Sequence, residues 1–256
     1  MDNTFEYYIE TNELHFKYAK GEPALKDREF HNYNEFVFFI SGDSYFVSKN
    51  IQQKLTAESL VIIPKEHFHQ FRVDYPETYI RCILAFRETS DIADITSEVM
   101  DTIKVISSLD LKIVALFKNI IEIVKSDLTD SEKVLHIRAS LVQLLIYLKL
   151  NPFDAIRKNV SLSPVVSQAL NIIDKEYTEK LTVDEIAKSL YISPSTLSHK
   201  FTDELNISVY QYITKKRLSS AYERIRQGES LTSAALNSGF GDYSCFYRLY
   251  KKYNKT

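Results

Sequence analysis

Two segments in the last third of the chain repeat one plan, and this repeat constrains the fold more than any other feature of the sequence. The first segment, LTVDEIAKSLYISPSTLSHKFTDEL, predicts a short helix capped by Thr182, a tight turn, and a second helix capped by Ser193. Leu197 and Phe201 lie four residues apart in that second helix, so both point to its buried side. This order of elements is typical of a helix-turn-helix motif.

The second segment, SLTSAALNSGFGDYSCFYRLYKKY, repeats the plan near the end of the chain. Asp242 is placed to cap its second helix, and Phe246 and Tyr250 repeat the spacing of the two apolar anchors. Each copy also carries a small residue, Ala187 or Ala235, where two helices can cross closely. Either copy alone could be an ordinary helical hairpin. Two copies joined by one helix favour a tandem helix-turn-helix domain.

The last third of the chain resembles the AraC/XylS-type transcription regulators. The stretch GFGDYSCFYRLYKKY follows that family's second motif: Gly-Phe, a polar turn, Tyr-Ser-x-Phe, then Arg, an aromatic residue and Lys-Lys. The resemblance implies a sequence-specific DNA-binding regulator controlled by a small-molecule effector. Ala234 and Ser238 stand where the family has bulkier aliphatic residues, and the family's final Gly, Pro and short helix do not follow in this sequence. We therefore expect a less stable second motif.

Residues on the outer face of the second helix of each motif are expected to meet DNA. These residues are Ser195, Thr196, Ser198, His199, Lys200, Tyr243, Ser244, Tyr247, Arg248 and Lys251. Arg248 can donate two hydrogen bonds to a guanine. The cations expected nearer to phosphates are Lys200, Lys215, Lys216, Arg217, Lys251 and Lys252. The alternative for each of these side chains is an ordinary solvated surface.

The charge distribution agrees with a DNA-binding C-terminal part. The chain has a net charge of −2, yet Lys and Arg outnumber Asp and Glu from Val160 onward, and the opposite holds before it. This difference suggests that only the C-terminal part meets a polyanion.

The first part of the chain favours β-strands over helices. EFVFFISGDSYFVSKN contains a hairpin signal at Ser41-Gly42-Asp43, and YIRCILAFR alternates apolar residues on one face. EFHNYNEFVFFISGD and VIIPKEHFHQF resemble the cupin-like effector barrel of the same regulators. The expected fold class is therefore α+β: an N-terminal jelly-roll, cupin-like β-barrel with a helical hairpin, followed by an all-α tandem helix-turn-helix domain.

Helical periodicity returns after the predicted strands. The ranges Leu111–Lys125 and Glu132–Leu150 predict a helical hairpin whose apolar stripes could cover the barrel, a second subunit, or both. We expect this hairpin to carry a homodimer contact. The expected domains are an effector-binding and dimerisation domain over 1–150, a linker over 151–163 and a DNA-binding domain over 164–256.

The resemblance also implies an effector pocket inside the barrel. Its candidate residues, chosen by strand position, are His31, Tyr33, Glu35, Phe38, His69, Phe71 and Arg81. Together with Glu29 and His67, some of these residues also resemble a cupin metal site in which Glu29 replaces a histidine. Because that ligand set is incomplete, we expect no metal and no cofactor. The alternative is a cupin-type metal-dependent enzyme with a helical oligomerisation appendage.

Several other classes of protein do not fit the sequence. No apolar run is long enough to span a membrane, and the acidic N-terminus does not look like a signal peptide. Cys82 and Cys245 lie far apart, which favours reduced thiols in a cytoplasmic protein. No order of Ser, His and Asp and no phosphate loop indicates an enzyme. The expected partners are double-stranded DNA, a small-molecule effector and a second copy of the chain, with RNA polymerase as a further candidate.

Overall fold

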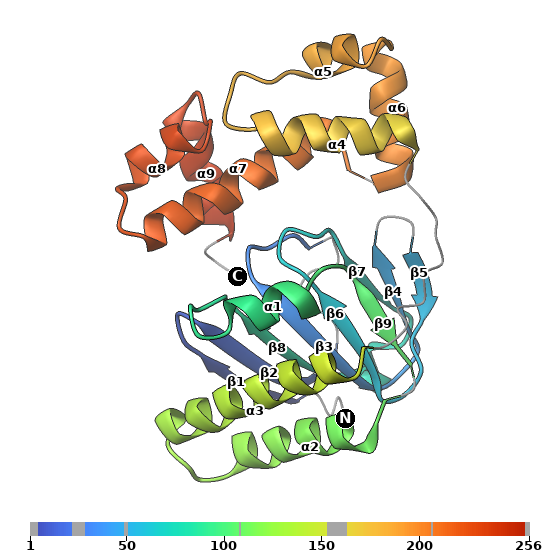
Figure 1. The fold of residues 1–256 in the computed structure, drawn as a ribbon, viewed down its shortest axis with the longest axis vertical. Coiled ribbons are helices and arrows are strands. Elements are labelled where there is room, and N and C mark those ends of the chain that lie inside the picture. The colour runs from blue at the N-terminus through green and yellow to red at the C-terminus, as the bar shows by residue number, and fades with distance from the viewer. Residues whose placement is uncertain are drawn as a thin grey trace. The chain divides into compact units, whose positions relative to one another are not determined.

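The computed structural model describes residues 5–21, 29–48, 51–107, 109–152, 163–205 and 207–253. The chain divides into two compact units, with the boundary between residues 159 and 160 (Figure 1). The first unit combines β-sheets with helices, and the described part of the second unit is helical. Most of the expected linker, residues 153–162, lies outside the described residues.

The strands of the first unit form two separate sheets. The larger sheet has six strands in the order β1-β2-β8-β3-β6-β9, and the smaller has three in the order β5-β4-β7. The bounds are β1 Phe5–Glu10, β2 Leu14–Lys20, β3 Asn34–Ser41, β4 Ser44–Ser48, β5 Ile51–Lys54, β6 Ser59–Ile63, β7 Gln70–Val73, β8 Ile80–Phe86 and β9 Lys104–Ile106. The prediction of strands in the first part is confirmed, but the described residues do not close into a barrel.

The six-stranded sheet is buried on both faces around β3. Phe36 and Phe38 face the helical layer, where the Phe38 ring stacks on the ring of Phe117 with centroids 4.7 Å apart. Val37 and Phe39 belong to the apolar cluster on the other face. Burial on both faces explains why this strand reads as an unbroken apolar run rather than an alternating one.

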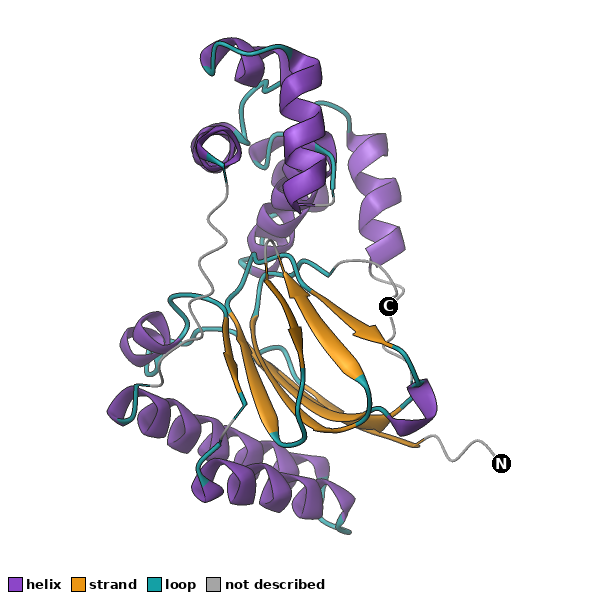
Figure 2. Cartoon of the chain, turned by 90° about the vertical axis from the view of Figure 1, so that its right-hand side faces the viewer, coloured by secondary structure: helices purple, strands orange, loops and turns teal. Residues whose placement is uncertain are grey.

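Three helices and one 3-10 turn complete the described part of the first unit. The helices are α1 Ala93–Val99, α2 Leu111–Lys125 and α3 Asp130–Leu150, and the 3-10 turn η1 spans Pro76–Thr78. Asp110 caps α2, and Thr129 caps α3 in a reciprocal pair with Glu132, so the predicted hairpin is confirmed. Figure 2 shows this pair of helices along one side of the strands.

One side of the helical hairpin is buried against the sheet. Phe117 and Ile120 of α2, together with Leu141 and Leu145 of α3, belong to the same core cluster as the sheet residues. Leu141 and Leu145 are 3% and 0% exposed, so a dimer contact of the hairpin would have to use its other residues. The dimer contact of the hairpin stays a prediction.

The second unit contains six helices in its described part. They are α4 Pro164–Glu176, α5 Val183–Ser189, α6 Pro194–Leu205, α7 Val209–Arg226, α8 Leu231–Asn237 and α9 Tyr243–Tyr253. Ser163 caps α4 with Pro164 in the first turn, and Thr182 caps α5, both as the sequence predicts. No described helix is both long and apolar enough to cross a membrane.

Candidate functional sites

The same tight turn occurs twice in the second unit. Between α5 and α6, the N–H of Ile192 donates a 3.0 Å hydrogen bond to the carbonyl of Ala187. Between α8 and α9, the N–H of Phe240 donates a 3.1 Å bond to the carbonyl of Ala235. Both alanines are fully buried. The repeated pattern of the sequence therefore corresponds to a repeated backbone geometry.

Tyr191 and Gly239 occupy the same position in the two turns. Each lies just before the residue that bonds back to the buried alanine, and each has a left-handed backbone, with φ of 56° at Tyr191 and 86° at Gly239. Glycine adopts this conformation readily, whereas tyrosine does so at a cost. The side chain of Tyr191 is 96% exposed. Sequence reasoning missed Tyr191, although aligning the two turns would have placed it opposite Gly239.

The turn between α8 and α9 packs closely against the end of α4. A Cβ atom added to Gly239 would lie 2.7 Å from Cα and O of Thr178. From α7, Arg217 donates hydrogen bonds to the carbonyls of Tyr177 (2.6 Å) and Glu179 (2.8 Å). The segment 177–179 thus joins the two motifs.

This junction bears on the expected roles of two cations. Arg217 is used to bind backbone carbonyls within the protein. The ammonium of Lys216 forms a 2.9 Å ion pair with Asp174, and its side chain is only 11% exposed. Both residues therefore have partners within the fold, and a place near phosphates stays a prediction for them. The side chain of Lys252 lies outside the described part of the structure.

Helix α6 presents a polar outer face over a buried apolar anchor. Leu197 and Phe201 are fully buried, and Ser193 caps the helix by accepting a 3.0 Å hydrogen bond from the N–H of Thr196. The five residues predicted on the outer face are all exposed: Ser195, Thr196, Ser198, His199 and Lys200.

Helix α9 repeats this arrangement with larger side chains. Phe246 is its buried anchor, and Asp242 accepts a 2.8 Å hydrogen bond from the N–H of Ser244. Of the residues predicted on its outer face, Tyr247 is half-buried and four are exposed: Tyr243, Ser244, Arg248 and Lys251.

The outer face of α9 carries a row of stacked side chains. The rings of Tyr243 and Tyr247 stack with centroids 5.7 Å apart, and the ammonium of Lys251 lies 4.7 Å from the Tyr247 ring. Arg248 Nε is 3.4 Å from the carbonyl oxygen of Ser244. Among the described residues, no carboxylate forms an ion pair with Arg248, Lys251 or Lys200. Their positive charge is therefore available to an anionic partner.

Comparisons with known proteins support this reading. Residues 186–256 match the helix-turn-helix domain family. The Msm operon regulatory protein of Streptococcus mutans is 24% identical over 84% of this chain and 79% of its own length. RafR, a raffinose operon transcriptional regulatory protein of Pediococcus pentosaceus, is 29% identical over 50% of this chain and 51% of its own length. A putative AraC-like regulator of Streptomyces lividans is 29% identical over 35% of the chain and 30% of its own length.

The C-terminal unit is an AraC-type helix-turn-helix domain. The resemblance stated from the sequence is confirmed, and the chain is a DNA-binding transcription regulator. Among solved structures, ToxT of Vibrio cholerae aligns over 97% of this chain and 93% of its own, with 14% identity and a TM-score of 0.41. A DNA-binding transcriptional dual regulator of Escherichia coli aligns over 35% of this chain and 86% of its own, with 27% identity and a TM-score of 0.32.

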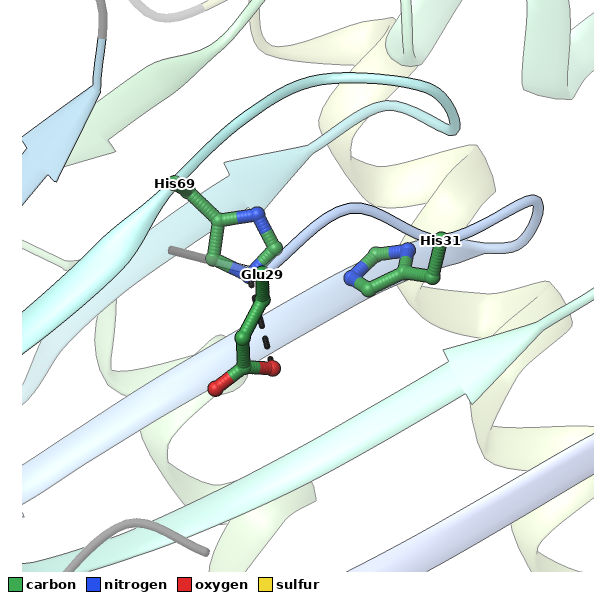
Figure 3. A group of neighbouring side chains, drawn as sticks. All are labelled: Glu29, His31 and His69. Carbon is green, nitrogen blue, oxygen red and sulfur yellow. Dashed lines mark ion pairs between the residues drawn. The ribbon is translucent and has the colours of Figure 1, made fainter. Parts of the chain in front are cut away.

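The first unit contains a second site, a cluster of ionisable side chains between β3 and β7. We call Glu29, His31, Glu35 and His69 the His–Glu cluster. Glu29 and His69 face each other across an isolated antiparallel bridge, with backbone hydrogen bonds of 2.7 and 3.2 Å. Nε2 of His31 and Nε2 of His69 each lie 3.3 Å from Oε2 of Glu35. Figure 3 shows Glu29 and His31, from the segment that leads into β3, next to His69 from a second segment.

Burial and mutual interaction shift the pKa values in this cluster. Burial opposes ionisation of Glu35, but His31 and His69 outweigh it and hold the pKa of Glu35 well below its ordinary value. Burial lowers the pKa of His69, but the Glu35 carboxylate raises it by more. The pKa of His69 therefore lies above its ordinary value. Burial and the charge of Glu35 raise the pKa of Glu29. The cluster is therefore electrostatically coupled in an otherwise apolar surrounding.

The other effector candidates lie at different places around this cluster. The ring of Tyr33 stacks on His31 at 3.9 Å, and Phe71 meets His69 edge-on at 6.2 Å. Arg81 is buried and donates a 2.9 Å hydrogen bond to the carbonyl of Gly21. Phe38 points to the helical layer on the opposite face of β3. The structure thus separates Phe38 from the other candidates.

Proposed function

We propose that the chain reads its operator with both helix-turn-helix motifs and responds to a small-molecule effector bound in the first unit. The observation that supports two reading helices is the shared design of α6 and α9. Each is capped at its N-terminus, anchored by a fully buried residue and exposed on its polar face. In this proposal the DNA-binding domain spans 164–256 and the effector-binding and dimerisation domain spans 1–150.

The side chains on the two helices suit different contacts with DNA. The hydroxyl groups of Ser195, Thr196 and Ser198 can donate to or accept from base edges or phosphates. The guanidinium of Arg248 can donate a bidentate pair to a guanine. Lys200 and Lys251 form no ion pair with a carboxylate of the described residues, and such charges suit phosphates, which position the protein without specifying sequence. We therefore assign sequence reading chiefly to α9.

We infer that the first unit is a cupin-like effector domain with the ligand between its two sheets. Buried polar groups are costly unless they have partners, and here Glu35, His69 and Arg81 are buried while His31 is half-buried. Tyr33 and Phe71 add aromatic surface beside the two histidines. The relative RafR is named for a raffinose operon, and sugar hydroxyls pair well with such groups. Oligosaccharides are therefore the first class of effector to test.

We further propose that the chain is a homodimer that binds paired half-sites. The supporting observation is a set of exposed apolar residues along α3. Its exposed members are Leu135, Ala139, Ile146 and Leu150, and Val142 between them is half-buried against the core, so that successive residues are three or four positions apart. Leu135 is 70% exposed and Ile146 is 45% exposed. This spacing is that of a helix seam packed against another helix. RNA polymerase would be a further partner of this dimer if the regulator activates transcription.

The proposal is tested by binding the purified full chain to DNA fragments from its own genomic neighbourhood. We expect one or a few fragments to bind at least ~1,000-fold more tightly than random duplex at fixed salt. Addition of an oligosaccharide effector is expected to change that affinity. Equal affinity for every fragment and for random DNA would contradict sequence-specific regulation.

A further inference from the structure

The His–Glu cluster has the spacing of a metal site. The potential ligand atoms of Glu29, His31 and His69 all lie within 4.8 Å of one another. Glu35 Oε2 lies 3.3 Å from both imidazole Nε2 atoms, and Glu29 Oε2 lies 3.9 Å from Nε2 of His69. Two ligand atoms bound to one ion at bond lengths of about 2 Å lie roughly 3.3 Å apart, which is the distance from Glu35 Oε2 to each imidazole Nε2. Glu29, His31 and His69 therefore surround one point, and Glu35 lies beside it, next to both imidazoles.

The tautomers of the two histidines favour a cation at that point. Nδ1 of His31 lies 2.9 Å from the carbonyl oxygen of Tyr33, and Nδ1 of His69 lies 3.1 Å from that of His67. A carbonyl oxygen only accepts, so Nδ1 must carry the hydrogen in both rings. In a neutral ring Nε2 then offers a lone pair. Without a metal, Nε2 of His31 must carry a proton to donate its 3.3 Å hydrogen bond to the Glu35 carboxylate, while Nε2 of His69 approaches the same oxygen without forming one. Such an arrangement of acceptors is stable only with a cation among them, either a proton on each ring or a metal ion.

A second observation separates these alternatives. Nε2 of His69 is fully buried and has no hydrogen-bond partner among the described residues, although Glu35 lies 3.3 Å away. The 3.3 Å contact with Glu35 is thus an ion-pair distance without hydrogen-bond geometry. A buried imidazole nitrogen that has no hydrogen-bond partner and lies next to other potential ligand atoms is typical of a metal ligand. Metal-bound histidines also commonly fix their other ring nitrogen on a backbone carbonyl, as both rings do here.

We propose that Glu29, His31, Glu35 and His69 bind a divalent first-row transition metal ion such as Zn²⁺ or Fe²⁺. Imidazole nitrogen with carboxylate oxygen is a ligand set for these ions. The sequence led us to expect no metal because Glu29 stands in place of a histidine. The geometry corrects the reason for that expectation, since a carboxylate at this place is itself a ligand. The inference goes beyond the proposed function and depends on neither DNA binding nor an organic effector.

The ion would connect the two sheets of the first unit. Glu35 lies in β3 of the six-stranded sheet, whereas His69 directly precedes β7 of the three-stranded sheet. Glu29 and His31 lie on the segment that leads into β3. Because the bound ion holds ligands from both sheets, it would stabilise the folded unit by an amount that grows with the logarithm of the free-ion concentration above the dissociation constant.

The test is a titration of the full chain, without an affinity tag, after removal of bound metal with a chelator. Zn²⁺ is added in competition with a chromophoric chelator, and Co²⁺ is added separately to record its visible absorption spectrum. We expect one equivalent of Zn²⁺ per chain, a Co²⁺ spectrum typical of nitrogen and oxygen ligands, and a rise in the midpoint of thermal unfolding with Zn²⁺. A wild-type chain that binds less than about 0.2 equivalent would overturn the proposal.

Matched variants assign the ion to the cluster. Glu29→Gln and His31→Asn each remove one ligand with little change in volume, and we expect each to weaken Zn²⁺ binding at least ~10-fold. His67→Ala removes a neighbouring histidine that lies outside the cluster, and its affinity should equal that of the wild type. Equal Zn²⁺ affinity in all four proteins would place the ion elsewhere and overturn the assignment. If a variant fails to fold, the wild-type stoichiometry and Co²⁺ spectrum still decide the proposal.

Discussion

At the scale of single residues, Tyr191 stands out because it holds a left-handed backbone that the second motif gives to a glycine. A left-handed backbone at a residue with a side chain destabilises the folded state by about 1–2 kcal/mol. Glycine removes this strain, but it also makes the unfolded chain more flexible, which offsets part of the gain in stability. We predict that Tyr191→Gly raises the free energy of unfolding of the C-terminal unit by about 0.5–1 kcal/mol. Urea denaturation of the full chain measures this difference.

The control for Tyr191 is Tyr191→Ala, which removes the exposed ring but keeps the backbone strain. This variant should not be more stable than the wild type. If alanine stabilises as much as glycine, the gain comes from removing the ring, and the argument from backbone strain is wrong.

Gly239 makes the opposite prediction, because its turn has no room for a side chain. A Cβ atom there would lie 2.7 Å from the backbone of Thr178, and φ is 86°. We expect Gly239→Ala to lower the free energy of unfolding by about 1–3 kcal/mol. Gly241→Ala is the matched control, since an added Cβ atom at Gly241 meets nothing within 4 Å. Comparable losses in both variants, by thermal or urea unfolding, would show that the close approach to Thr178 does not matter.

At the scale of secondary-structure elements, Arg217 of α7 links the two motifs by binding carbonyls at the end of α4. Arg217→Lys keeps the positive charge but cannot reproduce both hydrogen bonds. We predict a loss of about 1–3 kcal/mol in the free energy of unfolding. The salt dependence of DNA binding, measured by titration, should stay unchanged. A reduced salt slope without loss of stability would return Arg217 to the phosphate-binding role expected from the sequence.

The sequence predicted the helices of both units well because their ends carry local signals. The residues at the starts of α2, α4 and α5 form side-chain caps that can be read without knowing the fold. The strands were harder to assign to faces. Because β3 is buried on both faces, its sequence shows no alternation, and Phe38 could not be separated from Glu35. The three-residue strand β9 is too short to leave a pattern.

The exposure of the candidate DNA-contacting residues was predictable, because the spacing of residues along a helix shows which of them share its outer face. The His–Glu cluster was predictable only in part. The sequence identified its members, but their common orientation depends on the pairing of Glu29 with His69, which are distant in the sequence. The buried orphan nitrogen of His69 has no sequence signal at all.

At the scale of the whole molecule, the proposed dimer depends on the set of exposed apolar residues along α3. We predict that the double variant Leu135→Glu, Ile146→Glu halves the molecular mass measured by sedimentation equilibrium, because it introduces charges into the proposed seam. Leu111→Glu is the control, since Leu111 is 81% exposed at the start of α2 and lies outside that set. A wild-type chain that is already monomeric at micromolar concentration would contradict the proposed seam.

Helix α9 is proposed to read base edges, and substitutions of Arg248 and Lys251 on that helix distinguish base contacts from phosphate contacts. The measurement is titration of operator and random duplex with wild type, Arg248→Ala and Lys251→Ala over a series of salt concentrations. We predict that Arg248→Ala loses about 1–3 kcal/mol on the operator, with relaxed preference at one position, and much less on random DNA. Lys251→Ala should weaken both duplexes equally and reduce the salt slope by about one. Equal weakening of operator and random DNA by Arg248→Ala, or no change in either variant, would contradict the claim.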